Sequence, residues 1–406
     1  MKLAWGTANT QSGPQARRVA ITGLGVVSCV GLGKEAFWNG LNGPAPEGFR
    51  QVKDFDPSEW FNPKEARRVD RFTQFNVAAG QMAVDDAGGL ASLDVDPARA
   101  GVVMGAGVGG LDTLEKQIIS MHEGGFRKVS PFLVPMMMAN AGCASLSMRF
   151  GFQGPSEAIV TACAAGTHGI GNAARLVASG RCEIMLAGAS EAPLVDVGKA
   201  AFSNMTALST IGISRPFDEA RDGFILAEGA AVLVLEDLER AVGRGAHIYG
   251  EIAGAASTAD AYHITAPSPD GTGAAACIEL AIEDAGLQPS DITYVNAHGT
   301  STPLNDKAEA DAITKVFGLP GPAVTSIKGI TGHAAGSAGA IEAVAVALSM
   351  EYKAIPPTAG LVNLDPDIKI DVVVNSPRTW KPGPAISNSF GFGGHNGCLV
   401  FLPPPG

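Results

Sequence analysis

Cysteine is scarce in this chain, which has six among 406 residues. The six lack the spacing of a disulfide framework or a zinc site. Five stand in apolar or Ala/Gly surroundings and are interpreted as buried structural thiols, namely Cys29, Cys143, Cys182, Cys277 and Cys398. This usage is consistent with a reducing compartment, so we expect a cytoplasmic protein.

Basic residues are in deficit. The 29 Lys and Arg residues face 40 Asp and Glu residues, which gives a formal net charge of −11. Nothing then offsets phosphate repulsion, so the composition argues against nucleic acid as a partner. One local exception is the segment NPKEARRVDR, in which Lys64, Arg67, Arg68 and Arg71 gather. Charge alone explains this cluster better as a solvated helix face than as a binding site.

Long apolar runs are missing as well. The most apolar predicted helix, near 334–350, is interrupted by Glu342 and is too short to span a bilayer. Residues 1–16 lack the apolar core of a signal peptide, so we interpret them as a flexible extension. At the other end, 403–406 is expected to be a short tail. Hydrophobic residues make up 46% and charged residues 17%, which predicts a soluble protein with a large core.

Two six-residue strings are near-copies of each other. They are TACAAG at 161–166 and TGHAAG at 331–336, with Cys163 and His333 at the same position. Each follows a β-rich run and opens an Ala-rich segment that is typical of a helix. Each therefore predicts a tight strand-to-helix turn that places one reactive side chain at the helix start.

The duplication extends beyond these strings. AVDDAG at 83–88 recurs as AIEDAG at 281–286, and a strand with a Gly-rich turn follows each copy. The matched order predicts two homologous βαβ-rich halves, 17–253 and 254–402. The period is far too long for a solenoid.

Cys163 has the neighbours that a nucleophile needs. Its small flanking residues let a carbonyl approach, and a helix start favours the thiolate. Its backbone amide would face an oxyanion formed on an attached acyl group. A lone cysteine in this setting could equally be buried and inert, but the matching His333 favours catalysis.

His298 follows the predicted strand 292–296 and precedes a turn that contains Thr300 and Thr302. Ligands collect at strand ends in α/β sheets, and the two hydroxyls suit a polar chain. A satisfied structural histidine is the alternative. In the weakly charged segment around His333, Lys328 and Glu342 could form a buried pair that orients this histidine, or an exposed ion pair.

Two glycine-rich segments are candidates for ligand binding. SNSFGFGGHNG at 387–397 surrounds Phe390 and Phe392 with glycines, so its backbone could approach a ligand while a ring swings, or it could be an ordinary hairpin turn. GAGVGG at 105–110 lacks an acidic ribose partner in a βαβ setting, which rejects a dinucleotide site. No metal site is expected, because the histidines lack HxxxH pairing and carboxylates at ligand spacing.

TACAAG, NAHGTSTP, KGITGH and NSFGFGGHN occur in this order. With them the chain resembles the thiolase superfamily, and within it the elongating β-ketoacyl-acyl-carrier-protein synthases, closest to their type II enzymes. The resemblance covers about 17–402. It implies a thiolase-like α/β fold of five layers, α-β-α-β-α, in which each half contributes one mixed sheet.

The resemblance also implies an acyltransferase activity in fatty acid elongation. Cys163 would take the acyl chain from a carrier protein, and His298 and His333 would hold the malonyl thioester carbonyl during decarboxylation. The resulting enolate would attack the acyl group, whose oxyanion would rest on the amides of Cys163 and Phe392. Phe392 resembles a gating residue, with Phe390 beside it.

The remaining roles come from the same resemblance. Lys328 and Glu342 match an ion pair near the second histidine. Thr300 and Thr302 match pantetheine contacts, and Val108 matches a wall of the acyl pocket. No cofactor is expected, since the substrates carry phosphopantetheine on acyl carrier protein.

Two partners are implied. Carrier protein is acidic in this family, which makes Lys64, Arg67 and Arg68 candidates for its docking site. A homodimer is expected, because the strand 157–160 resembles a strand that pairs across subunits. Thr206 stands where relatives often have Arg, and the 208–215 loop is shorter than usual.

Other members of the superfamily are alternatives. Initiating synthases resemble a Cys-His-Asn set and thiolases a Cys-His-Cys set, and TGH at 331–333 excludes both. A polyketide ketosynthase subunit shares Cys-His-His and stays open. A noncatalytic chain-length partner subunit is a second alternative, although such subunits lack the nucleophile that Cys163 would supply.

Overall fold

The computed structural model describes residues 16–405. The strands up to the middle of the chain are β1 (Val19–Ser28), β2 (Gly31–Leu32), β3 (Ala100–Gly105), β4 (Ser156–Ile159), β5 (Ile184–Glu191) and β6 (Gly229–Asp237). Those that follow are β7 (Gly250–Ala259), β8 (Tyr294–Asn296), β9 (Ala323–Thr325), β10 (Ala354–Ile355), β11 (Asp371–Val372), β12 (Arg378–Thr379), β13 (Ala385–Gly391) and β14 (His395–Leu402).

The helices lie between these strands. The first group is α1 (Lys34–Leu41), α2 (Pro63–Ala66), α3 (Arg71–Asp86), α4 (Leu90–Leu93), α5 (Leu111–Gly124), α6 (Leu133–Met137), α7 (Ala141–Phe150), α8 (Ala165–Ala178), α9 (Asp196–Asn204) and α10 (Leu238–Gly243). The second group is α11 (Thr272–Asp284), α12 (Pro303–Phe317), α13 (Lys328–Thr331) and α14 (Ala338–Tyr352). Short 3₁₀ turns are η1 (Pro57–Glu59), η2 (Pro97–Arg99), η3 (Phe126–Lys128), η4 (Ala162–Ala164), η5 (Pro289–Asp291) and η6 (Ala335–Ser337).

Strand order repeats between the two parts of the chain. The main path of the sheet runs β11-β9-β8-β13-β14-β7-β1-β6-β5-β3-β4. Outward from its first strand, the second half gives β7-β14-β13-β8-β9, and the first half gives the corresponding order β1-β6-β5-β3-β4. β11 extends the second set beyond β9. In both sets the three outer strands are parallel and the two inner ones antiparallel. This repetition is the structural form of the duplication that the paired motifs predicted.

The two sets are not separate sheets. β1 pairs antiparallel with β7 from Val19 opposite Ile252 to Ile21 opposite Gly250, which joins them at their first strands. Each half therefore contributes one mixed set of strands, as expected, and the pairing of β1 with β7 joins the two sets into a single sheet. The predicted boundary at 253/254 falls inside β7 and stays a prediction, and the predicted extension at 1–16 lies outside the described residues except for residue 16.

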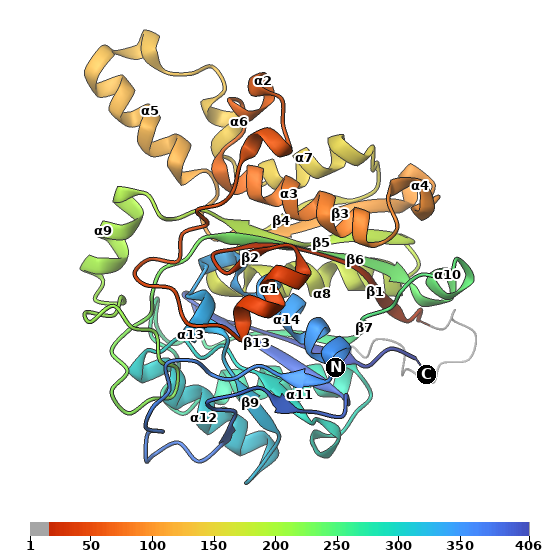
Figure 1. Cartoon of the computed structure of the whole chain (residues 1–406), viewed down its shortest axis with the longest axis vertical. Coiled ribbons are helices and arrows are strands. Elements are labelled where there is room, and N and C mark those ends of the chain that lie inside the picture. The colour runs from red at the N-terminus through yellow and green to blue at the C-terminus, as the bar shows by residue number, and fades with distance from the viewer. Residues whose placement is uncertain (1–15, 406) are drawn as a thin grey trace.

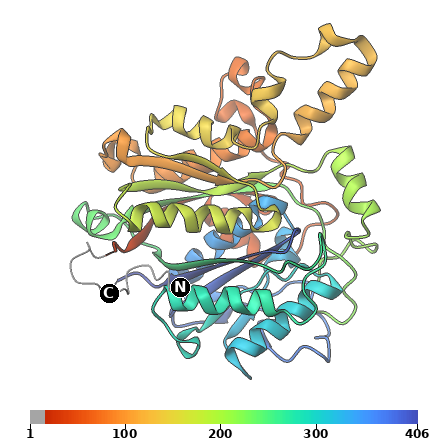
Figure 2. The ribbon, with the colours of Figure 1, turned by 180° about the vertical axis from the view of Figure 1, so that it is seen from behind.

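The layers follow from these two sets of strands. α3 and α7 cover the outer face of the first set, and α11 and α12 lie beyond the second (Figure 1). Between the two sets lie α8 and α14, which Figure 2 shows from behind. The predicted five-layer order α-β-α-β-α is confirmed. No helix within 16–405 combines the length and the apolarity that crossing a membrane needs.

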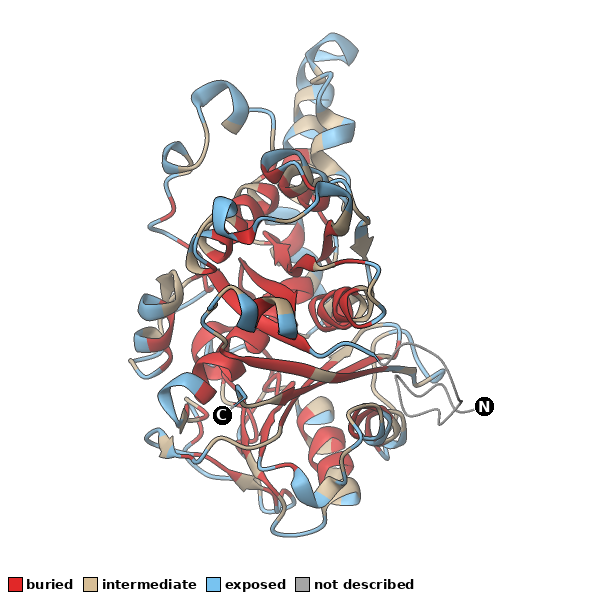
Figure 3. Cartoon of the chain, turned by 90° about the vertical axis from the view of Figure 1, so that its right-hand side faces the viewer, coloured by how far each residue is buried: buried red, intermediate tan, exposed pale blue. Residues whose placement is uncertain are grey.

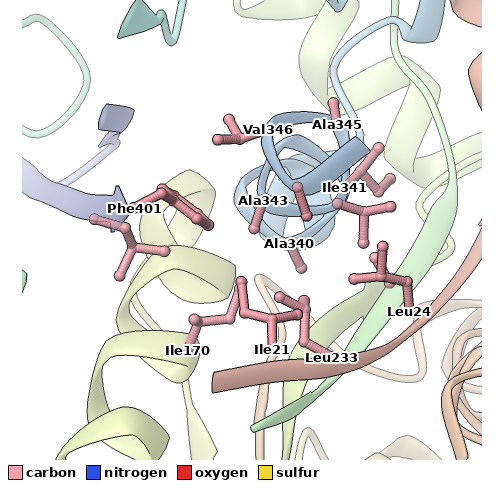
Figure 4. Packing of buried hydrophobic residues seen from close by; sticks show 14 of the residues in the cluster. Ile21, Leu24, Ile170, Leu233, Ala340, Ile341, Ala343, Ala345, Val346 and Phe401 are labelled. Atoms are coloured by element: carbon pink, nitrogen blue, oxygen red, sulfur yellow. The ribbon is translucent and has the colours of Figure 1, made fainter. Parts of the chain in front are cut away.

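The middle layer is the most buried part of the molecule (Figure 3). α14 is buried from Ala338 to Met350, which is why its sequence is apolar on all sides. Its small side chains let strands approach closely, and Figure 4 shows Ala340 and Ile341 beside Ile21 and Leu233. A Cβ on Gly166 would lie 2.7 Å from the Ala340 nitrogen, so this glycine lets the starts of α8 and α14 meet.

Candidate active site

Cys163 sits in the 3₁₀ turn η4, between the edge strand β4 and helix α8. The residue before it, Ala162, has a φ of 50°, which a residue with a Cβ adopts at a cost. This bend directs the thiol toward the second half of the chain, where its Sγ lies 3.1 Å from Nε2 of His333. The structure therefore brings together the two side chains that the paired motifs single out.

Burial raises the pKa of the Cys163 thiol to about 11. The Lys328 ammonium and the backbone N–H of Phe392 lower this pKa only in part. The expected advantage of a helix start for the thiolate is thus outweighed by desolvation, and the group is a neutral thiol at pH 7. The Phe392 amide thus lies beside the thiol sulfur, and its role as an oxyanion donor stays a prediction.

Both histidines are buried and share one wall of the site. Their ring centroids are 5.3 Å apart, with the planes nearly perpendicular. Burial and the nearby Lys328 ammonium lower the pKa of each imidazole well below its usual value. His298 and His333 are therefore neutral at pH 7 and can each offer one N–H to a ligand.

Lys328 fixes the tautomer of His298. Its Nζ donates to the backbone oxygen of His298 at 2.6 Å, lies 3.3 Å from Nδ1 of the same residue, and forms a buried ion pair with Glu342. An ammonium group only donates, so Nδ1 must accept and the imidazole proton resides on Nε2. The Lys328–Glu342 pair is confirmed as buried, and its contact is with His298 rather than with His333.

Sequence reasoning missed Glu309. This buried residue of α12 accepts the backbone N–H groups of His298 and Gly299, both at 2.7 Å. Burial raises the pKa of Glu309 to about 7, and the two amides oppose that shift. Its signal was the pair Asp306 and Glu309 at helical spacing directly after the Gly-Thr-Ser-Thr turn, where two acids on one helix face can hold turn amides.

A second missed contact is Phe224, whose ring packs edge-on against His333 with centroids 5.0 Å apart. The backbone that follows Phe224 runs beside the His333 turn, and the His333 N–H donates to the Ile225 oxygen. No residue pattern around Phe224 separates it from an ordinary core phenylalanine. Its role depends on tertiary packing alone.

A cavity of about 320 Å³ opens onto these residues. Cys163, His298 and His333 line it together with the predicted ligand contacts Thr300, Thr302, Phe390 and Phe392. The two threonine hydroxyls are 2.9 Å apart and hydrogen-bond to each other. Thr206 also lines the cavity, and no Lys or Arg does so among the described residues.

The structure leaves the other predicted residues outside this cavity. Val108 does not line it, and its side chain is 53% exposed. Lys64, Arg67 and Arg68 are exposed on and after the single-turn helix α2, with the Arg68 guanidinium over the ring of Phe132. Arg71 differs from these three residues, because its guanidinium forms an ion pair with the buried Glu228.

The remaining cysteines are free thiols. Cys143, Cys182, Cys277 and Cys398 are buried as predicted, while Cys29 is only partly buried. Across 16–405, no group of three or more His, Cys, Asp or Glu side chains is placed to hold a metal ion. The expectation of no metal centre stays a prediction.

Comparisons with known proteins agree with one another. The family model described as "Beta-ketoacyl synthase, N-terminal domain" matches residues 42–241, and "Beta-ketoacyl synthase, C-terminal domain" matches 249–362. A protein of Synechocystis sp. named 3-oxoacyl-(acyl-carrier-protein) synthase 2 is 44% identical, over 95% of this chain and 98% of its own. Its namesake from Vibrio harveyi is 43% identical over the same shares.

Solved structures resemble the fold closely. The ishigamide ketosynthase/chain length factor superimposes with a TM-score of 0.91 at 33% identity, over 96% of this chain and 100% of that one. A type II PKS acyl-carrier protein in complex with its ketosynthase gives 0.89 at 33% identity over the same shares. Family models, relatives and structures thus converge on one assignment. The chain belongs to the beta-ketoacyl synthase family.

Proposed function

We propose that this protein catalyses the decarboxylating Claisen condensation of an acyl chain on Cys163 with malonyl-acyl carrier protein, which yields β-ketoacyl-acyl carrier protein in fatty acid elongation. The observation that carries this proposal is the contact between the Cys163 thiol and His333 in a cavity that His298 also lines. The relatives at 42–44% identity, all named 3-oxoacyl-(acyl-carrier-protein) synthase 2, support it.

In the first step the Cys163 sulfur attacks the carbonyl of an acyl thioester. The carrier thiol leaves with the proton that the Cys163 thiol gives up, and the acyl group stays on the enzyme. His333 Nε2 lies 3.1 Å from the Cys163 sulfur, where its N–H can donate to the sulfur as negative charge develops. The raised pKa of the Cys163 thiol means that little thiolate exists beforehand.

In the second step malonyl thioester loses CO₂ and its carbonyl becomes an enolate. Two neutral imidazole N–H groups stabilise the developing oxyanion without removing a proton, which suits this charge change. The enolate carbon attacks the acyl-Cys163 carbonyl, the C–C bond forms and the C–S bond breaks. The Cys163 and Phe392 amides are the donors for the intermediate oxyanion. The Cys163 thiolate that leaves takes up one proton from solvent, which balances the negative charge that the malonyl carboxylate brought in.

The carrier protein delivers the substrate, so phosphopantetheine enters as part of the substrate and no separate cofactor is required. Thr300 and Thr302 lie along the cavity where the polar part of that arm would pass. Phe390 and Phe392 flank the same passage, which supports a gating role. Val108, outside this cavity, is assigned to the wall of a deeper acyl pocket that a second subunit would complete.

A homodimer is the proposed assembly. β4 ends the sheet, so one of its edges has no strand partner among the described residues. Next to it lie apolar side chains with large exposure, including Val160 at 54% and Met148 at 77%. An unpaired edge and an apolar surface fit a second copy related by a twofold axis. A monomeric mass in sedimentation at micromolar concentration would contradict this.

Docking of acyl carrier protein is assigned to Lys64, Arg67 and Arg68. They are exposed, and their field stands out against a chain of net charge −11. Changing Arg67 and Arg68 to Glu should raise the KM for carrier-bound substrates and leave pantetheine thioesters unaffected. The matched control changes Lys369 and Lys381, exposed lysines of the second half, to Glu. Equal losses with both kinds of substrate would make the cluster structural.

Mass spectrometry tests the main proposal. After incubation with acyl-acyl carrier protein, wild type and a Cys29→Ser control should gain the acyl mass, and Cys163→Ser should not. Adding malonyl-acyl carrier protein should then release β-ketoacyl product. Absence of an acyl adduct in wild type would favour a noncatalytic partner subunit. Acceptance of repeated malonyl additions without ketone reduction would favour a polyketide subunit, the class of the neighbours at 33% identity.

A further inference from the structure

The glycine-rich loop GAGVGG at 105–110 surrounds a buried carboxylate. Glu191, the last residue of β5, is 1% exposed. Its Oε2 accepts the N–H of Gly107, and its Oε1 accepts those of Val108 and Gly109, both at 3.2 Å. Successive backbone N–H groups of this kind form an anion-binding concavity, and here a side chain of the same protein fills it.

A further amide reaches Glu191 from the second half of the chain. Gly336 N–H donates to Oε2 at 3.1 Å, and Gly336 lies three residues after His333 in the same turn. Four backbone amides counter the desolvation of this carboxylate. Through them Glu191 holds the 107–109 loop and the His333 turn together.

Glycine is required on both sides of this contact. A Cβ on Gly107 would lie 2.6 Å from the Glu191 Oε2 atom. One on Gly336 would lie 2.7 Å from the same oxygen and 2.2 Å from the Gly107 nitrogen. All three distances are below van der Waals contact, so the two backbones approach this closely only as glycines. The composition of the loop thus reflects the carboxylate rather than a phosphate.

We propose that Glu191 is a positioning residue, whose carboxylate sets the spacing between the 107–109 loop and the His333 turn and thereby the placement of the His333 ring beside Cys163. The consequence for the reaction rests on the proposed condensation, in which His333 must meet both the thiol and the malonyl carbonyl. The charge of Glu191 also reaches the nucleophile. Burial is the main cause of the raised pKa of the Cys163 thiol, and Glu191 adds to it.

Three variants separate position from charge. Glu191→Gln removes the charge and turns an NH₂ donor toward the amides. Glu191→Asp keeps the charge but shortens the reach to Gly336. Asp70→Asn is the matched control, since Asp70 is 2% exposed and holds the N–H groups of Phe72 and Thr113 at 3.1 and 2.8 Å. Thermal unfolding establishes that each variant is folded.

Two readouts are taken on the full-length protein. The first is kcat for decarboxylation of malonyl-acyl carrier protein, which should fall at least about tenfold in Glu191→Gln and Glu191→Asp. The second is the alkylation rate of Cys163 by iodoacetamide between pH 7 and 9. It should rise about threefold at a given pH in Glu191→Gln, because loss of the nearby negative charge lowers the pKa of the Cys163 thiol, and stay unchanged in Glu191→Asp. Asp70→Asn should change neither.

Wild-type kcat in a folded Glu191→Asp variant would overturn the positioning role. Equal losses of kcat in Asp70→Asn would also overturn it, because any buried acid would then suffice. If Glu191→Gln does not fold, Glu191→Asp alone decides between these outcomes. Alkylation needs no carrier substrate, so a wild-type protein without condensing activity would refute the proposed function and still leave the charge of Glu191 measurable at Cys163.

Discussion

The turns at Cys163 and at His333 have the same sequence pattern and lie in different surroundings. In both, the residue before the reactive side chain has a positive φ, 50° at Ala162 and 68° at Gly332. A helix follows each, α8 after the first and α14 after the second. The Cys163 turn follows β4 directly, whereas the single-turn helix α13 intervenes between β9 and His333.

The surroundings explain why one copy carries the nucleophile. β4 lies at the edge of the sheet, and Cys163 opens onto the cavity beside it. His333 also lines this cavity, but it is only 4% exposed and its ring packs against that of Phe224. An acyl acceptor must be accessible to substrate, and a hydrogen-bond donor must have a fixed orientation. The turn in the first half makes Cys163 accessible, and the equivalent turn in the second half fixes His333.

Removing the nucleophile should have the largest effect. Cys163→Ser replaces the thiol with a hydroxyl, which is less acidic and a weaker nucleophile, so elongation should fall by ~10³-fold or more. Decarboxylation should survive in part, because both imidazoles remain. Assays of condensation and of CO₂ release from malonyl-acyl carrier protein check the two outcomes. Equal acyl-enzyme formation in wild type and variant would refute the assignment.

His333→Ala breaks the other side of the comparison. Loss of one N–H donor to the developing enolate should lower the rate of decarboxylation by about 10²- to 10³-fold. Acyl transfer to Cys163 should decline less, because the sulfur and its oxyanion amides remain. His247→Ala, which changes a half-exposed histidine paired with Glu351, is the control. Decarboxylation at the wild-type rate in His333→Ala would contradict the role of His333.

Lys328→Met tests the support of His298, the other histidine of the site. It leaves Glu342 as an unpaired buried charge, which should lower the free energy of unfolding by about 3–5 kcal/mol. The double variant Lys328→Met with Glu342→Leu should recover most of this stability and little of the activity, because Nδ1 of His298 still lacks its donor. Denaturant unfolding and decarboxylation assays measure the two effects. Recovery of both together would mean that Lys328 serves stability alone.

The paired motifs predicted the main features of the fold and the central contact of the site. The near-identity of TACAAG and TGHAAG placed Cys163 and His333 at equivalent turns, and the structure brings their side chains to 3.1 Å. Such a prediction was accessible because duplication leaves a copy in the sequence itself. The pairing of β1 with β7, which joins the two sets of strands into one sheet, could not be predicted from the sequence. Strand pairing between distant segments leaves no local pattern.

The partner of Lys328 within the site could not be read from spacing. Proximity in sequence suggested His333, five residues away, and the structure gives His298. The reason is that α13 turns the lysine toward β8, where His298 begins the next loop. Glu191 was missed for a related reason. Its partners are backbone amides, which every residue has, so no side-chain pattern indicates its role.

Gly332→Ala adds to the second turn the methyl group that the first already carries at Ala162. At Gly332 a Cβ would lie 2.5 Å from Cγ of Arg50 and 2.8 Å from the Ile225 oxygen. Overpacking of this kind, with a φ of 68°, should lower the free energy of unfolding by about 2 kcal/mol. Urea unfolding measures it. An unfolding midpoint and slope equal to those of wild type would contradict this. The buried residues around the His333 turn would then accommodate a methyl group as readily as the residues around Ala162 at the rim of the cavity.

The reverse exchange, Ala162→Gly, should have the smallest effect and the opposite sign. Relief of the left-handed backbone at Ala162, whose φ is 50°, should gain about 1–2 kcal/mol. The greater freedom of glycine in the unfolded chain should cost roughly 0.5–1 kcal/mol, so a small net stabilisation is expected. Ala164→Gly is the matched control, because Ala164 has a φ of −89° and gains no relief. Urea unfolding compares the two variants with wild type. If Ala162→Gly loses as much stability as Ala164→Gly, the positive φ at Ala162 does not strain the backbone. The two turns would then have the same backbone shape, and the Cys163 turn would adopt it at no cost in free energy.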